Sequence, residues 1–180
     1  ARTAAGKPVG ILLDTKGPEV RIRDFENGKV ELKEGQEFIL YSDEQPGTER
    51  GVSLSYPTLY RDVSMGTRIL IDDGLIEMIV LKLEGKDIVC KVLNGGTVSN
   101  KKGVNVPDAH LSMPYLSEKD KQDIIFGIEQ DVDFIAASFV RTEDDVIAIR
   151  TLLDQNGGEK IHIIAKIENQ EGVNNFDAIL

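Results

Sequence analysis

The C-terminal third of the chain alternates between a helical and a strand-like hydrophobic period, and this alternation restricts the fold more than any other feature. Helical patterns begin after Ser117 and after Thr142, and an aspartate three residues later completes a typical N-terminal capping signal in both cases. Predominantly apolar segments typical of buried strands follow at 132–140 and 161–167. Helices that alternate with strands through short connections predict parallel strands covered by helices, which is an α/β fold.

A further strand is expected close to the N-terminus. Val9–Leu13 is a continuous apolar run, and the polar residues Asp14, Thr15 and Lys16 follow it directly. A short, fully apolar run predicts a strand that is buried on both faces. We expect this strand to join the same sheet as the two later strands.

The middle of the chain follows a different pattern. Between about residues 21 and 106, short alternating segments are separated by turn signals such as Asn27-Gly28. Many short strands with frequent turns predict a small antiparallel barrel or sandwich. We therefore expect an inserted all-β domain over 23–108, flanked by α/β segments at 1–22 and 109–180.

Composition and charge exclude several classes of function. The net charge of -10 argues against nucleic-acid binding through a basic surface and against binding to anionic membranes. Cys90 is the only cysteine, so no internal disulfide can form, and no apolar run is long enough to span a bilayer. These features favour a cytoplasmic protein.

The chain starts without Met and ends in an apolar, helix-like stretch, and we therefore expect a fragment of a longer protein.

Lys166 and Glu168 are the strongest candidates for chemistry. Side chains in a strand alternate between faces, so these two residues point the same way near the end of the strand that begins at Ile161. In parallel α/β folds, ligands bind at this end of the strands. The carboxylate could bind Mg²⁺, and the ammonium could neutralise charge on a substrate oxygen or, with a lowered pKa, form a Schiff base. The simpler alternative is a surface Lys-Glu pair on an exposed edge strand.

Other polar positions leave more than one interpretation open. The oxygens of the Asp14-Thr15 segment could hold a cation, or the segment could form a simple turn. Ser138 follows two alanines, so the small residues could leave room for a ligand or could serve tight packing alone. Asp72-Asp73-Gly74 is most simply a hairpin turn, and the short basic patch Lys101-Lys102-Gly103 is most simply a solvated turn.

Six motifs in a fixed order give the chain a resemblance to a known family. They are Leu13-Asp14-Thr15-Lys16-Gly17-Pro18-Glu19, Asp72-Asp73-Gly74-Leu75-Ile76, Lys101-Lys102-Gly103-Val104-Asn105-Val106-Pro107, Ser117-Glu118-Lys119-Asp120, Ala137-Ser138-Phe139-Val140-Arg141 and Lys166-Ile167-Glu168-Asn169-Gln170-Glu171-Gly172. Together they resemble the pyruvate kinases, in particular the bacterial ones, over essentially the whole chain.

The resemblance implies part of a TIM-type (β/α) barrel, interrupted by a small β-rich domain that closes over the site as a lid. It implies phosphoryl transfer from phosphoenolpyruvate to ADP in glycolysis, giving pyruvate and ATP, with Mg²⁺ or Mn²⁺ and K⁺ as cofactors and a homotetrameric parent protein. By the family pattern, Lys166 would be the catalytic lysine, and Ser138 would lie in the phosphoenolpyruvate pocket. Glu168 would be a Mg²⁺ ligand, and Asp14 and Thr15 would be K⁺ ligands. Asp73 and Lys102 would lie on lid segments near the nucleotide.

The chain also departs from the family pattern. An early Arg-x-Asn-Phe-Ser-His segment is absent, and the later Gly-Asp-Leu segment would begin just past Leu180, so we expect negligible activity of the chain in isolation and a tendency to self-associate. Asp108-Ala109-His110 replaces a commonly glycine-containing segment, a change expected to affect a hinge more than the chemistry. Two other hypotheses remain: a Schiff-base or Mg²⁺-dependent barrel lyase or aldolase that uses Lys166, and a non-catalytic β binding module on an α/β scaffold.

Overall fold

The computed structural model describes residues 4, 6–107 and 109–180. The chain divides into two compact units, one formed by residues 1–18 and 113–180 and the other by residues 19–112. The first is called the α/β unit below and the second the β unit. The opening Ala1-Arg2-Thr3 and the hinge residue Asp108, on which expectations were placed, lie outside the described residues.

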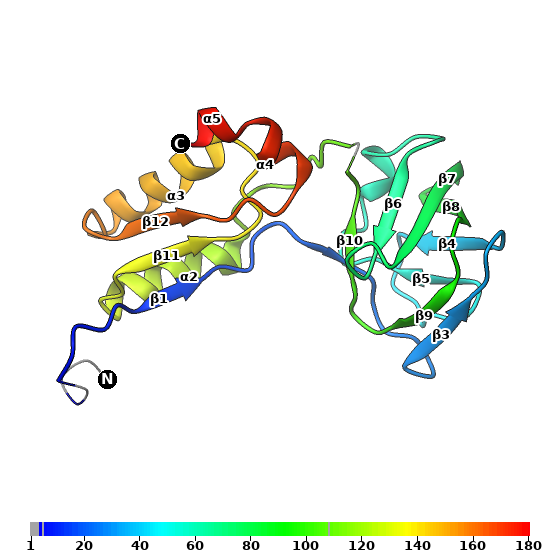
Figure 1. Ribbon diagram of the computed structural model, residues 1–180, viewed down its shortest axis with the longest axis horizontal. Helices are drawn as coiled ribbons and strands as arrows, with labels where there is room; N and C mark the ends of the chain where they lie inside the picture. The colour runs from blue at the N-terminus through cyan, green and yellow to red at the C-terminus, as the bar shows by residue number, and fades with distance from the viewer. Residues whose placement is uncertain (1–3, 5, 108) are drawn as a thin grey trace. The chain divides into compact units, whose positions relative to one another are not determined.

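The α/β unit contains a parallel sheet with helices beside it. Its strands lie in the order β1-β11-β12, and both pairings are parallel (Figure 1). The prediction that the N-terminal strand joins the two later strands in one parallel sheet is therefore confirmed. The elements are β1 (Leu12–Asp14), α2 (Glu118–Glu129), β11 (Phe134–Ala137), α3 (Glu143–Gln155), β12 (His162–Ala165), α4 (Gln170–Asn174) and α5 (Phe176–Ile179).

Both predicted capping signals start a helix. At α2, the Ser117 side chain accepts a hydrogen bond from the Asp120 amide (3.1 Å), and the Asp120 carboxylate accepts one from the Ser117 amide (3.1 Å). At α3, the Thr142 amide donates to the Asp145 carboxylate at 3.3 Å. These exchanges satisfy amide groups that the first turn of a helix leaves unpaired, which fixes where each helix begins.

The two faces of the parallel sheet differ in burial. Leu13, Ile163 and Ala165 pack against a core that includes Ile124 of α2 and Ile149 of α3. On the opposite face, Leu12 is 49% exposed and Ile164 is 42% exposed. The prediction that the first strand is buried on both faces was therefore wrong, and β12 is likewise half-exposed, because α2 and α3 pack against one face of the sheet only.

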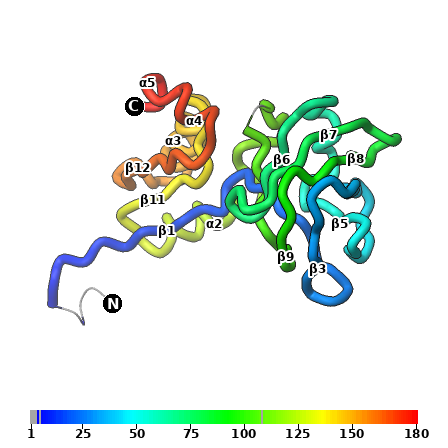
Figure 2. The backbone as a smooth tube through the Cα atoms, turned by 45° about the vertical axis from the view of Figure 1, so that its right-hand side comes forward, coloured from blue at the N-terminus to red at the C-terminus, as the bar shows by residue number. Residues whose placement is uncertain are grey.

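The β unit is built from short strands. Its larger sheet has the order β2-β10-β6-β7-β8-β4-β5, and β9 returns from far along the chain to pair with β3 (Figure 2). Asp72, Asp73 and Gly74 all have positive φ and join β6 to β7 as the expected hairpin. The elements are β2 (Val20–Arg21), β3 (Lys29–Leu32), β4 (Glu37–Tyr41), β5 (Gly51–Ser53), the 3-10 helix η1 (Leu59–Arg61), β6 (Arg68–Ile71), β7 (Ile76–Glu84), β8 (Asp87–Val92), β9 (Gly96–Ser99) and β10 (Gly103–Asn105).

The whole chain is therefore of mixed α/β structure, as predicted. Within the described residues, the structure contains no helix with the length and apolar character that a bilayer crossing requires.

Candidate active site

Three polar side chains meet at the carboxyl ends of the parallel strands. In the register of the sheet, Asp14 lies opposite Ala136, which in turn lies opposite Ile164. Ser138 and Lys166 each come two residues further along their strands, so strand alternation turns them to the same face as Asp14. The Lys166 amide donates to the Ala137 carbonyl at 2.9 Å, which extends the pairing one residue beyond β12.

The ammonium group of Lys166 lies at the centre of this arrangement. Its Nζ atom is 3.0 Å and 3.3 Å from the two Asp14 carboxylate oxygens, 3.0 Å from the Ser138 hydroxyl and 3.5 Å from the Glu168 carboxylate. The Lys166 side chain is 31% exposed. Lys166 and Glu168 thus lie together as predicted. Within the described residues β12 is an edge strand of the sheet, but the contacts of Lys166 with Asp14 and Ser138 distinguish the two residues from a simple surface pair.

The surroundings of Lys166 favour its charged form. Partial burial alone would lower the pKa of the amine, but the hydrogen bond to Asp14 and the charges of Glu168 and Asp14 outweigh that effect, and the pKa is raised. A Schiff-base lysine needs a neutral amine and hence a lowered pKa. This electrostatic environment therefore supports an ammonium that stabilises negative charge.

Thr15 and Ser138 connect β1 to β11 through buried hydrogen bonds. The Ser138 hydroxyl lies 2.6 Å from the Thr15 carbonyl oxygen and 3.0 Å from the Asp14 carboxylate. In return, the Ser138 amide donates to the Thr15 hydroxyl at 3.1 Å, and that hydroxyl donates to the Ala136 carbonyl at 3.3 Å. Of the two interpretations of the Asp14-Thr15 segment, the simple turn is insufficient, because its side chains are held by the neighbouring strand.

We expect Thr15→Val to destabilise the protein by about 1–2 kcal/mol, because the valine leaves the buried Ser138 amide without its acceptor. Thr15→Ser keeps the hydroxyl and is the matched control, with an expected loss of less than about half as much. Urea unfolding of the two variants measures the difference. Equal losses for valine and serine would show that the hydroxyl contributes nothing.

The oxygen atoms around Lys166 suit hard cations. Asp14 contributes a carboxylate, Thr15 a carbonyl oxygen and Glu168 a partly exposed carboxylate. Oxygen ligands of this kind are those that Mg²⁺ and alkali cations prefer, and Mg²⁺ commonly takes only one or two carboxylates from the protein. The part of the chain that the structure describes contains no group of three or more His, Cys, Asp or Glu side chains arranged to hold a metal ion.

The remaining predicted residues, Asp73 and Lys102, belong to the β unit. They lie on neighbouring segments, since Lys102 precedes β10 and its ammonium is 2.9 Å from the carboxylate of Asp72 at the β6–β7 turn. The hydrogen bond that the guanidinium of Arg21 donates to the Glu19 carboxylate raises the pKa of Arg21, and the charge of Asp73 adds to this effect. Of the seven predicted site residues, the structure thus gathers five in the α/β unit and places two in the β unit.

Comparison with known proteins decides the family. A family model described as the barrel domain of pyruvate kinase matches residues 1–180. The chain belongs to the pyruvate kinase family. Pyruvate kinases of Bacillus licheniformis, Clostridium acetobutylicum and Geobacillus stearothermophilus are 54%, 50% and 52% identical to it, over 97%, 99% and 100% of the chain. The chain spans 30%, 38% and 31% of the length of these three relatives.

The similarity to bacterial pyruvate kinases that the six motifs indicated is thereby confirmed.

Tyr115 was not predicted as part of the site, although its hydroxyl donates to the Ser138 carbonyl at 3.0 Å. The residue lies in the segment before α2, and no motif or spacing marked it. Burial, with the charges of Asp145 and Asp120, raises the pKa of Tyr115 well above its usual range, so the hydroxyl remains a donor.

Arg141 also occupies a defined place beside these residues. Its guanidinium lies 5.9 Å from the centre of the Tyr115 ring and 3.3 Å from the Asp145 carboxylate, and it donates to the Met113 carbonyl at 3.2 Å. Arg141 fixes the segment that carries Tyr115.

Proposed function

We propose that the parent protein of this chain transfers the phosphoryl group of phosphoenolpyruvate to ADP, giving pyruvate and ATP. The observation that carries the proposal is the Lys166 ammonium, which lies between Asp14, Ser138 and Glu168 at the carboxyl edge of the parallel sheet. The names and the similarity of the relatives support it. Because the chain spans about a third of those relatives, the activity is assigned to the longer protein.

In this reaction the bond between phosphorus and the bridging oxygen breaks, and its electron pair stays on the oxygen as an enolate. The enolate takes up a proton to give pyruvate, while a terminal oxygen of ADP forms the new bond to phosphorus. Lys166 stabilises the negative charge as it develops, and its raised pKa keeps the amine charged for this role. Ser138, whose hydroxyl contacts both Lys166 and Asp14, lines the phosphoenolpyruvate pocket.

Two kinds of cation belong to the proposal. Glu168 would hold Mg²⁺ or Mn²⁺, and Asp14 with the Thr15 carbonyl would contribute to a K⁺ site. When bound, the divalent ion supplies neutralisation of phosphate and enolate charge, as in other phosphoryl-transfer enzymes. The protein residues hold the substrate in place, and exclusion of water protects the phosphoryl group from hydrolysis.

The proposal extends to the organisation of the parent. Residues 1–22 and 109–180 would belong to a TIM-type barrel, and 23–108 would form the inserted lid, with Asp73 and Lys102 on lid segments near the nucleotide. The division of the structure near residues 18 and 113 supports this arrangement. We further propose a cytoplasmic homotetramer, by analogy with the family alone.

The decisive experiment compares the three hypotheses in the full-length protein. The kinase proposal predicts pyruvate formation that requires ADP and a divalent cation, and predicts that Glu168→Gln raises the Mg²⁺ concentration needed for half-maximal rate. A lyase or aldolase would instead give a substrate adduct on Lys166 after borohydride reduction, which the raised pKa of that lysine argues against. A binding module would show no turnover at all. Absence of ADP-dependent turnover in a folded protein would contradict the proposal.

A further inference from the structure

A single peptide bond, between Ser138 and Phe139, connects Tyr115 to Glu168. Its carbonyl oxygen accepts the hydrogen bond from the Tyr115 hydroxyl at 3.0 Å. Its N–H group donates to the Glu168 carboxylate at 3.0 Å. The two groups of a trans peptide point in opposite directions, so the bond that holds the carbonyl also sets the direction of the N–H.

This peptide leads into an unfavourable backbone conformation. Phe139 has φ of 54°, which is in the left-handed region that residues with a side chain rarely adopt. Such a conformation persists only where surrounding contacts hold it in place. Rotation of the peptide would relieve the strain at Phe139 and would turn its N–H away from Glu168.

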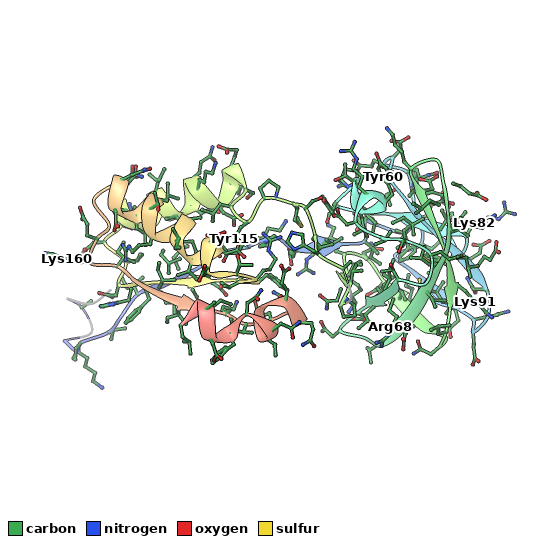
Figure 3. The ribbon with its side chains drawn as sticks, turned by 90° about the horizontal axis from the view of Figure 1, so that it is seen from above. Tyr60, Arg68, Lys82, Lys91, Tyr115 and Lys160 are labelled. Carbon is green, nitrogen blue, oxygen red and sulfur yellow. The ribbon has the colours of Figure 1, made fainter. Side chains whose placement is uncertain are left out.

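Tyr115 is well placed to prevent that rotation. The residue is 7% exposed and belongs to the core of the α/β unit (Figure 3). Arg141 lies against its ring and bonds to the Met113 carbonyl, two residues before Tyr115. The hydroxyl is therefore a fixed donor, directed at one carbonyl oxygen.

We propose that Tyr115 is a positioning residue for the metal-binding carboxylate. Its hydroxyl fixes the Ser138–Phe139 peptide, and the N–H of that peptide directs Glu168 toward the cation. The proposal rests on the function assigned above only in that it takes Glu168 to be a metal ligand. In this proposal Tyr115 acts through the peptide and is not itself a ligand of the metal or the substrate.

The test is a direct Mn²⁺ titration of the full-length protein, in which electron paramagnetic resonance measures the free ion. For Tyr115→Phe, which keeps the ring but removes the hydroxyl, we expect the dissociation constant to rise about tenfold, the range seen when groups that orient metal ligands are removed. We also expect the half-saturating Mg²⁺ concentration to rise while kcat at saturating Mg²⁺ changes less than about threefold. Tyr56→Phe is the matched control, because it removes a tyrosine hydroxyl that donates to Asp62 at 2.8 Å in the β unit. It should leave Mn²⁺ affinity unchanged.

A rescue variant separates positioning from packing. Glycine adopts a positive φ without penalty, so adding Phe139→Gly to Tyr115→Phe should recover most of the lost Mn²⁺ affinity. The double variant also provides a folded comparison if Tyr115→Phe alone is unstable. No recovery, or wild-type affinity in Tyr115→Phe, would overturn the inference. Glu168→Gln is measured alongside: if it binds Mn²⁺ as the wild type does, the assignment of Glu168 has failed, and the fault lies with the proposed function.

Discussion

Lys166→Met in the full-length protein is expected to lower kcat by at least about 100-fold, the effect typical of removing one group that stabilises charge in a transition state. Methionine has a similar length but no charge, so the enolate would form with the divalent ion as its main counter-charge. The substitution also leaves Asp14 and Glu168 without the cation that lies within 3.0 Å and 3.5 Å of them. Steady-state kinetics at saturating phosphoenolpyruvate, ADP and Mg²⁺ measures the effect.

Lys160→Met is the matched control for this experiment. Lys160 precedes β12 at the opposite end of the strand from Lys166, and its side chain points away from the sheet (Figure 3). The same chemical change there should leave kcat within about twofold of the wild type. If Lys166→Met behaved like Lys160→Met, the non-catalytic hypothesis would gain support and the kinase proposal would lose its central residue.

Gly17→Ala is expected to cause the largest loss of stability. Gly17 has φ of 68°, and a Cβ atom on it would lie 2.5 Å from the carbonyl oxygen of Ser138. The left-handed conformation alone costs a residue with a side chain about 1–2 kcal/mol. The clash is with backbone, so one of the two loops has to move, and we expect a total loss of about 3 kcal/mol in the free energy of unfolding.

The control isolates the clash from the backbone strain. Gly157 has φ of 80°, but a Cβ atom there would have no neighbour within 4 Å. Gly157→Ala should therefore lose only about 1 kcal/mol. Denaturant unfolding of both variants gives the comparison. Equal losses would mean that the approach of Gly17 to Ser138 is not a constraint on the fold.

Features that depend on residues close together in the sequence could be predicted, and features that depend on contacts between distant segments could not. Ser117 with Asp120 and Thr142 with Asp145 act within one turn of chain, and the sequence was sufficient to locate the start of both helices. Strand alternation also led to the expectation that Lys166 and Glu168 share a face, and they do lie 3.5 Å apart, although β12 ends at Ala165 and Glu168 lies in the loop beyond it. The exposure of Leu12 and Ile164 was not predictable in this way, because it depends on which face of the sheet the helices leave uncovered.

The hydrogen bonds of Glu168 and Tyr115 could not be predicted from the sequence either, because they too depend on segments that are distant along the chain. Glu168 bonds to an amide that is presented by a residue with positive φ, and Tyr115 reaches Ser138 from a segment without regular structure. Periodicity carries no information about such loop conformations. The resemblance to the family indicated which residues belong to the site, but it did not indicate the hydrogen bonds that hold them in place.

We infer that the Lys166 ammonium and the Glu168 carboxylate serve one pocket at the carboxyl ends of the parallel strands. A crystal structure of the full-length protein with Mn²⁺ and an unreactive phosphoenolpyruvate analogue tests it most directly, because anomalous scattering locates the ion independently of the protein atoms. We expect the Mn²⁺ peak to be coordinated by Glu168, with Lys166 in contact with the bridging oxygen of the analogue. An ion bound away from Glu168, or an analogue outside the reach of Lys166, would contradict the account.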